Sequence, residues 1–523
     1  MKKFLVSAMA VLALAACSKF NENGNSAVQN GELEQSYVAI TLAADDMTRA
    51  ADGVYEEGLA AEREVKSAYV FFFKDGAAFH VAFDGTTSTS TNGGPNNYLK
   101  VDLRTIDTEM PNVSDVKDAV LVLQNYKGEY PNQMLAVLNW TPEKSSYTLS
   151  ELQTKISTLG DATNGFVMSN AVYADAAGQV VDAVDLTINN IAKNETDALK
   201  NPVTIHVERV AAKVVYTANN GGKFPVGKEI EGKPVFAQIK GFELYNDYQE
   251  SWLLKRIDPT WTGLGFDWND EDFYRSYWAQ SLGKAFENNT FAWETDNTQI
   301  GQWNYLGENT RAWTEAADVR TKVVVKAQLV DTDGQPFEVV NWYGKDYIGE
   351  GNLLKVVANT LKNTYFSSAD GSTFVGLKPE DIKCVDREVT DAKAFEVYFQ
   401  LSTDGANKTW YKYENGNYSY IDVPTMNSEL VKVQPALVYK NGMTYYWLDI
   451  KHLGNGQGKA GDYGIVRNHV YKVNISDIKG YGTPVYDGTS DFIVPDKPED
   501  IVTYVSAQIN ILSWRVVEGN YEI

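Results

Sequence analysis

Histidine is scarce in this sequence. The 523 residues contain four histidines, scattered along the chain as His80, His206, His452 and His469. The HExxH pattern of zinc hydrolases, the GxSxG pattern of serine hydrolases and a Walker-type phosphate loop are all absent from the sequence. The sequence therefore predicts a protein that is not an enzyme and that holds no cofactor or metal.

Cysteine is rarer still, with two residues, Cys17 and Cys384. Cys17 lies in a lipid-attachment motif described below, which leaves Cys384 as the one cysteine of a chain that crosses an oxidising compartment. No intramolecular disulfide is then expected, so the fold must be stabilised by burial of a hydrophobic core. A chain of this length is expected to form two or three domains.

Positive charge is in the minority. The chain has 47 lysines and arginines against 69 aspartates and glutamates, a formal net charge of −22. A surface of this sign repels nucleic acid and anionic membranes, and it keeps an exported protein in solution. No nucleic-acid partner is therefore expected.

Aromatic residues are abundant, with 31 tyrosines and 12 tryptophans. Together with β-branched runs closed by turn signals, they predict a mainly β fold with few short helices. Thr148 and Glu151 form a capping box that predicts a short helix carrying Leu152 and Ile156. The expected strands cover residues 65–73, 134–140, 203–216 (one strand, or two with a break), 321–329 and 394–401.

The first residues carry an export signal. Lys2 and Lys3 precede an apolar run at 4–14, which suits a signal peptide and is too short to span a bilayer as a helix. Residues 14–17 (LAAC) resemble the bacterial lipobox, in which the cysteine receives a lipid before cleavage. The alternative is an ordinary signal peptide with a chance cysteine. Ser18 stands where an aspartate would retain a lipoprotein at the inner membrane, so the outer membrane is expected.

A separable strand follows the signal. Residues 18–36 are polar and suit a tether. Residues 37–42 then alternate, with Val38, Ile40 and Leu42 on one face. Arg49 is the only basic residue between Lys19 and Arg63, and its small, polar neighbours are typical of a loop that proteases enter. On these residues alone, a first strand followed by an ordinary loop is the favoured interpretation.

The C-terminal residues remain strand-like, although chain ends usually fray. A one-residue slip in the period-two pattern indicates a bulge or kink between two strand segments. The segment is either the last strand of the chain's own sheet or a strand buried elsewhere. The apolar positions before the slip are Val505, Ala507, Ile509 and Ile511, and those after it are Leu512, Trp514 and Val516.

Several motifs, taken in order, resemble the Mfa-type major fimbrial subunits of Bacteroidales, relatives of the type V pilus fimbrillins. They are the lipobox, 48–50 (TRA), 207–213 (VERVAAK), 275–279 (RSYWA), 308–310 (ENT), 321–328 (TKVVVKAQ), 466–473 (VRNHVYKV), 480–484 (GYGTP) and 511–517 (ILSWRVV).

This resemblance implies two tandem transthyretin-like β-sandwich domains and assembly by strand exchange. An Arg-specific surface protease would cut between Arg49 and Ala50 and free the leader strand. The C-terminal strand, about 501–517, of another copy would fill the groove that remains. The implied segments are a signal peptide (1–17), a propeptide (18–49), an N-terminal domain (50–208) and a C-terminal domain (209–523) with its donor strand in 501–523.

The implied protein is a fimbrial shaft subunit that supports adhesion and biofilm formation. It would be a lipidated outer-membrane precursor, anchored through Cys17, before it joins an extracellular fimbrium. Its partners would be copies of itself, accessory anchor and tip subunits, and the protease.

The competing hypothesis is a surface lipoprotein that binds glycans without polymerising. Aromatic platforms suit sugar rings, although packing in a sandwich core explains the same residues and is preferred. The acidic segment 267–272 (DWNDED) lacks the spacing and the glycine of a calcium loop, and a solvated loop is expected there. The tryptophans concerned are Trp252, Trp261, Trp268, Trp278, Trp293 and Trp303.

Overall fold

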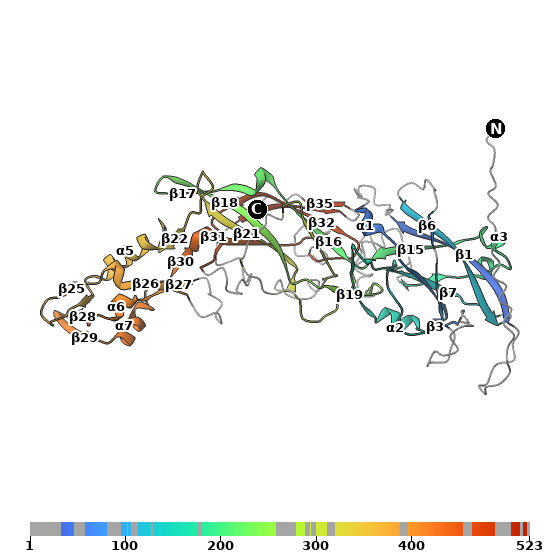
Figure 1. The fold of residues 1–523 in the computed structure, drawn as a ribbon, viewed down its shortest axis with the longest axis horizontal. Helices are drawn as coiled ribbons and strands as arrows, with labels where there is room; N and C mark the ends of the chain where they lie inside the picture. The colour runs from blue at the N-terminus through green and yellow to red at the C-terminus, as the bar shows by residue number, and fades with distance from the viewer. Residues whose placement is uncertain are drawn as a thin grey trace, which may run out of the picture.

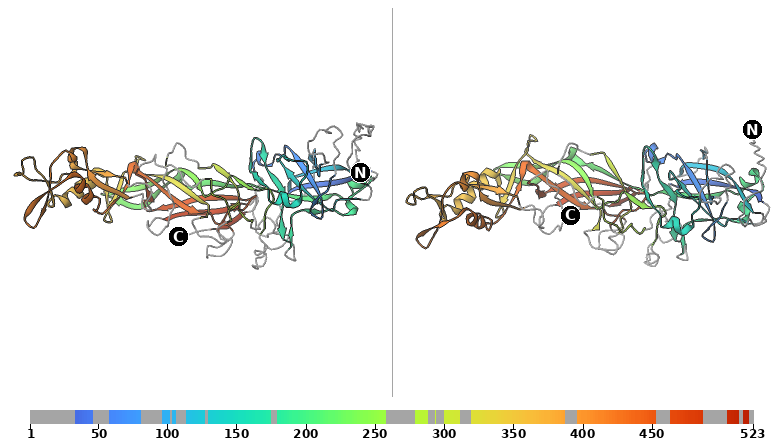
Figure 2. Two further views of the ribbon diagram at one scale, coloured as in Figure 1. Left: turned by 90° about the horizontal axis from the view of Figure 1, so that it is seen from below. Right: turned by 60° about the horizontal axis from the view of Figure 1, so that its bottom comes forward.

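The described part of the chain is built mainly of strands, as predicted, with a few short helices. The computed structural model describes residues 33–45, 58–80, 96–101, 103–105, 113–126, 129–174, 179–257, 279–287, 293, 300–310, 319–386, 396–452, 463–486, 504–512 and 516–519. Figures 1 and 2 show three units in a row along one axis. We call them the first unit, the central sandwich and the distal unit.

The first unit contains one large sheet with the strand order β3-β2-β7-β11-β15-β1-β6-β5, to which β4 and β14 are added at β2 and β7. Its helices are α1 (Ala60–Arg63), α2 (Leu149–Gln153) and α3 (Glu195–Ala198). The strands are β1 (Leu33–Asp45), β2 (Ala68–Lys74), β3 (Ala77–Ala78), β4 (Tyr98–Lys100), β5 (Arg104–Thr105), β6 (Val113–Tyr126), β7 (Gln133–Leu138), β11 (Met168–Asn170), β14 (Val184–Asp185) and β15 (Val203–Arg209).

Two hydrophobic clusters cover the two faces of this sheet. In β2, Val70 and Phe72 belong to one cluster while Phe71 and Phe73 belong to the other. Successive side chains of a strand point to opposite faces, so a strand covered on both sides needs a continuous apolar run. This is why the sequence at β2 and β7 reads as uninterrupted apolar residues rather than as an alternation.

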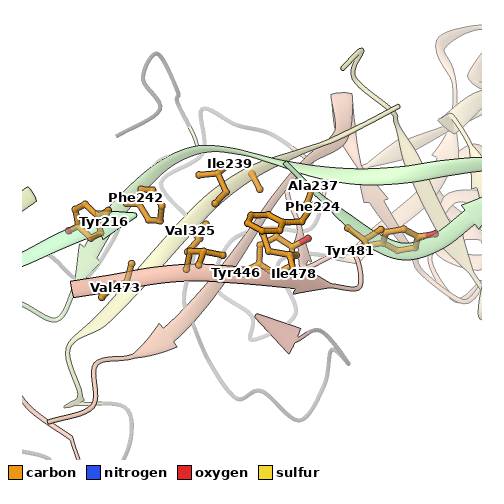
Figure 3. Packing of buried hydrophobic residues seen from close by; sticks show 14 of the residues in the cluster. Tyr216, Phe224, Ala237, Ile239, Phe242, Val325, Tyr446, Val473, Ile478 and Tyr481 are labelled. Carbon is orange, nitrogen blue, oxygen red and sulfur yellow. The ribbon is translucent and has the colours of Figure 1, made fainter. Parts of the chain in front are cut away.

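The central sandwich packs two five-stranded sheets face to face. Figure 3 shows part of the core between them, in which Tyr216 stacks on Phe242 with ring centroids 4.9 Å apart. One sheet contains β20 (Trp303–Leu306), β16 (Ala212–Ala218), β32 (Val470–Lys479), β34 (Tyr504–Leu512) and β35 (Val516–Gly519). The other contains β17 (Lys223–Ile230), β18 (Lys233–Tyr245), β21 (Lys322–Val330), β31 (Met443–Asp449) and β33 (Thr483–Pro484).

The distal unit is inserted in the sequence between β21 and β31; one of its strands was expected at 394–401, but the sequence patterns did not indicate a separate unit. Its helices are α5 (Glu350–Leu361), α6 (Thr403–Ala406) and α7 (Val423–Leu430). One sheet contains β23 (Lys345–Ile348), β22 (Val339–Trp342), β30 (Ala436–Tyr439), β27 (Glu396–Leu401) and β26 (Ile382–Val385). The other contains β25 (Val375–Gly376), β24 (Tyr365–Ser367), β28 (Trp410–Glu414) and β29 (Asn417–Ile421).

The five strands expected from the sequence are present, with ends shifted by a few residues. The run 203–216 forms two strands, β15 and β16, which belong to different sheets. This change of sheet supports a domain division near 207–213, which we retain as a proposal.

The predicted capping box is present, but the predicted helix was too long. Thr148 accepts a hydrogen bond from the Glu151 backbone N–H, and Leu152 of α2 is buried. Ile156 lies outside the helix and begins β8 (Ile156–Thr158), where it is 42% exposed. The helix ends at Gln153, and the chain then forms β8, which pairs with β19 (Glu250–Trp252).

Candidate functional site

The leader strand β1 occupies an internal position in the first sheet. On one side it pairs in antiparallel register with β6 over its whole length, from Leu33 opposite Tyr126 to Asp45 opposite Val113. On the other side it pairs in parallel with β15, from Ile40 opposite Val203 to Ala44 opposite Val207. Removal of β1 would therefore leave two strand edges open, one on each side.

Two of the three predicted leader-strand residues are buried in the core of the first unit. Val38 and Ile40 are 0% and 1% exposed and pack in one cluster with Leu121 of β6 and Ile205 of β15. Leu42 lies on the same strand, and its side chain is outside the described residues. Ala39, on the opposite face, is 1% exposed, so β1 is covered on both sides.

The predicted lipidation and cleavage residues lie outside the described ranges. Cys17 precedes the first described residue, Leu33. Arg49 and Ala50 fall between Asp45, where β1 ends, and residue 58, where the description resumes. Both positions remain predictions.

The chain after the predicted cut is fixed to the central sandwich through Glu62 of α1, which is 1% exposed. Its carboxylate lies 2.6 Å from the Lys213 ammonium and accepts a hydrogen bond from the Tyr305 hydroxyl. Arg209 donates to the Glu62 backbone carbonyl at 2.6 Å. Burial opposes ionisation, but the hydrogen bonds from Lys213 and Tyr305 outweigh it and hold the pKa of Glu62 below its usual value.

A second buried ion pair lies nearby, between the Arg467 guanidinium and the Glu308 carboxylate. Their closest atoms are 2.7 Å apart, and both side chains are almost wholly buried. Arg467 also donates to the backbone carbonyls of Trp252 and Leu253, at 2.7 and 3.3 Å. A charged group at such a site is stable only while its partners remain in place.

Three of the sequence motifs meet at this junction between the first unit and the central sandwich. Glu208 and Lys213 belong to 207–213, Glu308 to 308–310 and Arg467 to 466–473. Glu208 itself pairs with Lys255 at 2.9 Å, with both side chains buried. These residues form buried ion pairs where the first unit joins the central sandwich. The spacing of the motifs in the sequence does not reveal that they meet there.

The predicted donor segment forms a hairpin in the chain's own central sandwich. β34 pairs in antiparallel register with β32, from Tyr504 opposite Lys479 to Leu512 opposite Val470, and β35 pairs with β34. Trp514 lies outside the described residues, and the other predicted donor positions lie on the backbone of β34 or β35. These are Val505, Ala507, Ile509, Ile511 and Leu512 in β34, and Val516 in β35.

The tryptophans of the competing hypothesis differ in their surroundings where they are described. Trp293 is 7% exposed and donates to the Thr444 carbonyl at 2.7 Å. Trp303 is 37% exposed, with the Lys213 ammonium 4.3 Å from its ring centroid. Trp252 lies in β19 and is half-buried. Trp261, Trp268, Trp278 and the acidic segment 267–272 fall outside the described residues.

The remaining candidates from the sequence are a cysteine and two histidines, which the structure describes as packing or surface residues. Cys384 is buried in β26, and burial raises the pKa of its thiol. His469 is fully buried and contacts the Arg467 carbonyl, whereas His206 is exposed on β15. Among the described residues there is no cluster of three or more potential metal ligands. Nor do they contain a helix long and apolar enough to cross a membrane.

Residues 437–520 match a family model described as "Major fimbrial subunit protein type IV, Fimbrillin, C-terminal". No curated protein sequence matches the chain. Similar solved structures include a putative cell adhesion protein from Parabacteroides distasonis, with 14% identity, a TM-score of 0.38 and coverage of 90% of this chain and 95% of that one. Another is a fimbrilin from Porphyromonas gingivalis, with 12% identity, a TM-score of 0.37 and coverage of 90% and 96%. A third, the tip fimbrial protein Mfa3 from Porphyromonas gingivalis, has 12% identity, a TM-score of 0.29 and coverage of 91% and 99%.

Proposed function

We propose that the chain, whose residues 437–520 match the fimbrillin C-terminal family model, belongs to the fimbrillin family and is the structural shaft subunit of a cell-surface fimbria. The fimbrillin family consists of structural proteins rather than enzymes. The chain would be exported as a lipoprotein modified at Cys17, cut by an Arg-specific protease between Arg49 and Ala50, and polymerised by strand exchange. The filament would serve adhesion and biofilm formation, together with accessory anchor and tip subunits.

The position of β1 carries this proposal. A strand with partners on both sides is ordinarily a permanent part of its sheet, yet β1 precedes the only arginine between Lys19 and Arg63. A cut at Arg49 would leave β1 held to the rest of the chain by non-covalent contacts alone. The new N-terminal segment would stay in place, because Glu62 is fixed by Lys213 and Tyr305.

The open slot would be costly in water. Its two edges expose backbone donors and acceptors, and the pockets of Val38 and Ile40 expose apolar surface. An incoming strand would recover the ladder hydrogen bonds together with about 1.5–3 kcal/mol for each large apolar side chain that it buries, before ordering costs. Strand addition to an open sheet edge is a recurrent mode of recognition.

The proposed donor is the C-terminal hairpin of another copy. β34 has 9 residues and β1 has 13, so β34 alone would refill most of the slot. The hairpin lies in the central sandwich and the slot in the first unit, as Figure 1 shows, so the two surfaces of one contact differ. Such a contact is heterologous and does not close, which produces a filament rather than a ring. In the donating copy, β34 must first leave β32.

Truncation before Ile501 tests the donor assignment. The trimmed, truncated chain would accept a strand but could not provide one, so it should form no polymer on its own. Mixed with full-length subunits, it should end growing filaments and shorten the ladder of heat-labile species in electrophoresis of unboiled samples. Only a truncated chain with a folded first unit can accept a strand and end a filament. Shortening of the ladder would therefore show that the chain has lost its donor strand and has not simply unfolded. Polymers formed by the truncated chain alone would rule out the C-terminal donor.

A further inference from the structure

The distal unit carries an outward sheet face made of aromatic side chains. In the sheet β25-β24-β28-β29, Phe366 lies opposite Tyr411, Tyr411 opposite Tyr420, and Tyr413 opposite Tyr418. Residues opposite each other in register share a face, as do residues two apart on a strand. These five aromatic residues therefore lie on one side of the sheet.

The opposite side of the same sheet packs onto the core of the distal unit. Tyr365, Trp410 and Ile421 are 6%, 1% and 8% exposed and belong to its hydrophobic cluster. The aromatic side, by contrast, faces outward, with Tyr418 at 40% and Tyr420 at 68% exposure. Figure 1 places β25, β28 and β29 at the end of the molecule farthest from the first unit.

The rings of this face support one another. Tyr418 stacks on Phe374 with centroids 3.7 Å apart and an interplanar angle of 4°, and it also contacts Phe366 and Tyr413 at 5.1 and 4.8 Å. Tyr411 lies 6.2 Å from Tyr420. Packed aromatic rings are preorganised and lose little freedom when a ligand binds. We call this surface, formed by Phe366, Phe374, Tyr411, Tyr413, Tyr418 and Tyr420, the aromatic face.

A basic pocket adjoins the aromatic face at Phe366. Its volume is about 440 Å³, and its lining includes Lys355, Lys362 and Lys378 and no acidic residue. Of these lysines, Lys378 lies 3.8 Å from Glu380. Gly376 allows β25 to approach the end of α5, since a Cβ there would lie 2.5 Å from the Lys362 carbonyl oxygen. This close packing holds the Lys362 backbone against Gly376 of β25, which lies opposite Phe366.

We propose that the aromatic face and the basic pocket together bind an acidic saccharide. Aromatic rings offer flat apolar surfaces to the C–H faces of sugar rings, and tyrosine hydroxyls hydrogen-bond to sugar hydroxyls. Lysines attract carboxylate or sulfate groups. In a chain with a net charge of −22, a pocket lined by three lysines and no acid is a local exception that selects anions. Its volume is that of a small-molecule site.

Binding is tested on the untrimmed, unpolymerised chain, so the result is independent of strand exchange. The probes are a hyaluronan hexasaccharide, a heparin hexasaccharide and neutral maltohexaose, measured by isothermal titration calorimetry at two salt concentrations. We expect an acidic probe to bind, maltohexaose not to bind, and the affinity to fall as salt rises.

Two pairs of variants locate the site. Tyr420→Ala and Lys362→Glu should each weaken binding roughly tenfold or more, as truncation of a central contact does. The matched controls are Tyr343→Asn, at a tyrosine that is 72% exposed outside the aromatic face, and Lys383→Glu, at an exposed lysine of β26. Tyr343 has a φ of 51°, a conformation that asparagine tolerates. Both controls should bind as the unaltered chain does.

Three results would overturn the proposal. The first is that the unaltered chain binds neither acidic probe. The second is that binding occurs without the features of the proposed site: maltohexaose binds as tightly as the acidic probes, or Tyr420→Ala and Lys362→Glu leave the affinity for the acidic probes unchanged. The third is that the unaltered chain self-associates, that Tyr420→Ala makes it monomeric, and that no saccharide binds, since the aromatic face would then be a contact between copies of the chain.

Discussion

A disulfide between β1 and β6 should stop polymerisation without stopping proteolysis. Tyr37 and Val122 lie opposite each other in the antiparallel pair. Tyr37 exchanges both backbone hydrogen bonds with Ala192, at 2.8 and 2.9 Å, so its backbone groups point away from β6. The Tyr37–Val122 pair is therefore a non-hydrogen-bonded pair, whose side chains approach closely enough for a disulfide.

The double variant Tyr37→Cys/Val122→Cys should behave differently in its two redox states. When oxidised, it should be cut after Arg49 but remain monomeric, because the leader strand cannot leave. After reduction, the same sample should produce the heat-labile ladder. The single variants should polymerise in both states. Polymers formed by the oxidised, trimmed double variant as readily as by the unaltered chain would show that β1 need not leave.

Loss of the Arg467 guanidinium should strongly destabilise the junction. Arg467→Met keeps most of the side-chain volume but leaves the buried Glu308 carboxylate without its partner. Breaking a buried ion pair from one side costs about 3–5 kcal/mol. The measurement is the free energy of unfolding of the central sandwich in urea, followed by tryptophan fluorescence.

Two controls separate the ion pair from simple loss of a charge. Arg320→Met removes a more exposed partner, of Asp449, and should cost about 1 kcal/mol or less. The double variant Arg467→Met/Glu308→Gln removes both charges and should recover part of the loss, because no unpaired charge remains. If Arg467→Met costs no more than Arg320→Met, the junction does not depend on this pair.

Local sequence patterns predicted the strands well, because the alternation or continuity of apolar residues within a strand indicates which of its faces are buried. The continuous apolar run at 134–138 is covered on both faces, and the alternation at Val38 and Ile40 marks an apolar face. The helix prediction failed at Ile156, which begins β8 and lies opposite Trp252 of β19, a pairing that the local sequence does not contain.

Contacts between distant residues could not be predicted in the same way. Arg209 donates to Asn468, 259 residues away, and Arg467 pairs with Glu308, 159 residues away. The spacing of these residues in the sequence does not indicate that they contact one another. The sequence motifs could therefore be recognised, but the contacts that they form could not be predicted. The aromatic face was missed for a related reason, since the tyrosines of β28 and β29 share a face with Phe366 and Phe374 only after β24 pairs with β28.

The sequence also left open where β1 would lie. Its alternation predicts a strand, but its parallel pairing with β15, which follows more than 150 residues later, comes from the fold. Because of that pairing, β1 is an internal strand of the sheet rather than an edge strand. Its loss would therefore open the edges of both β15 and β6.

N-terminal sequencing of subunits purified from surface filaments tests the central claim most directly. Release of the leader strand requires a mature chain that begins at Ala50, with β1 absent. A filament subunit that begins at lipid-modified Cys17, or at any residue that keeps β1 attached, would contradict the account.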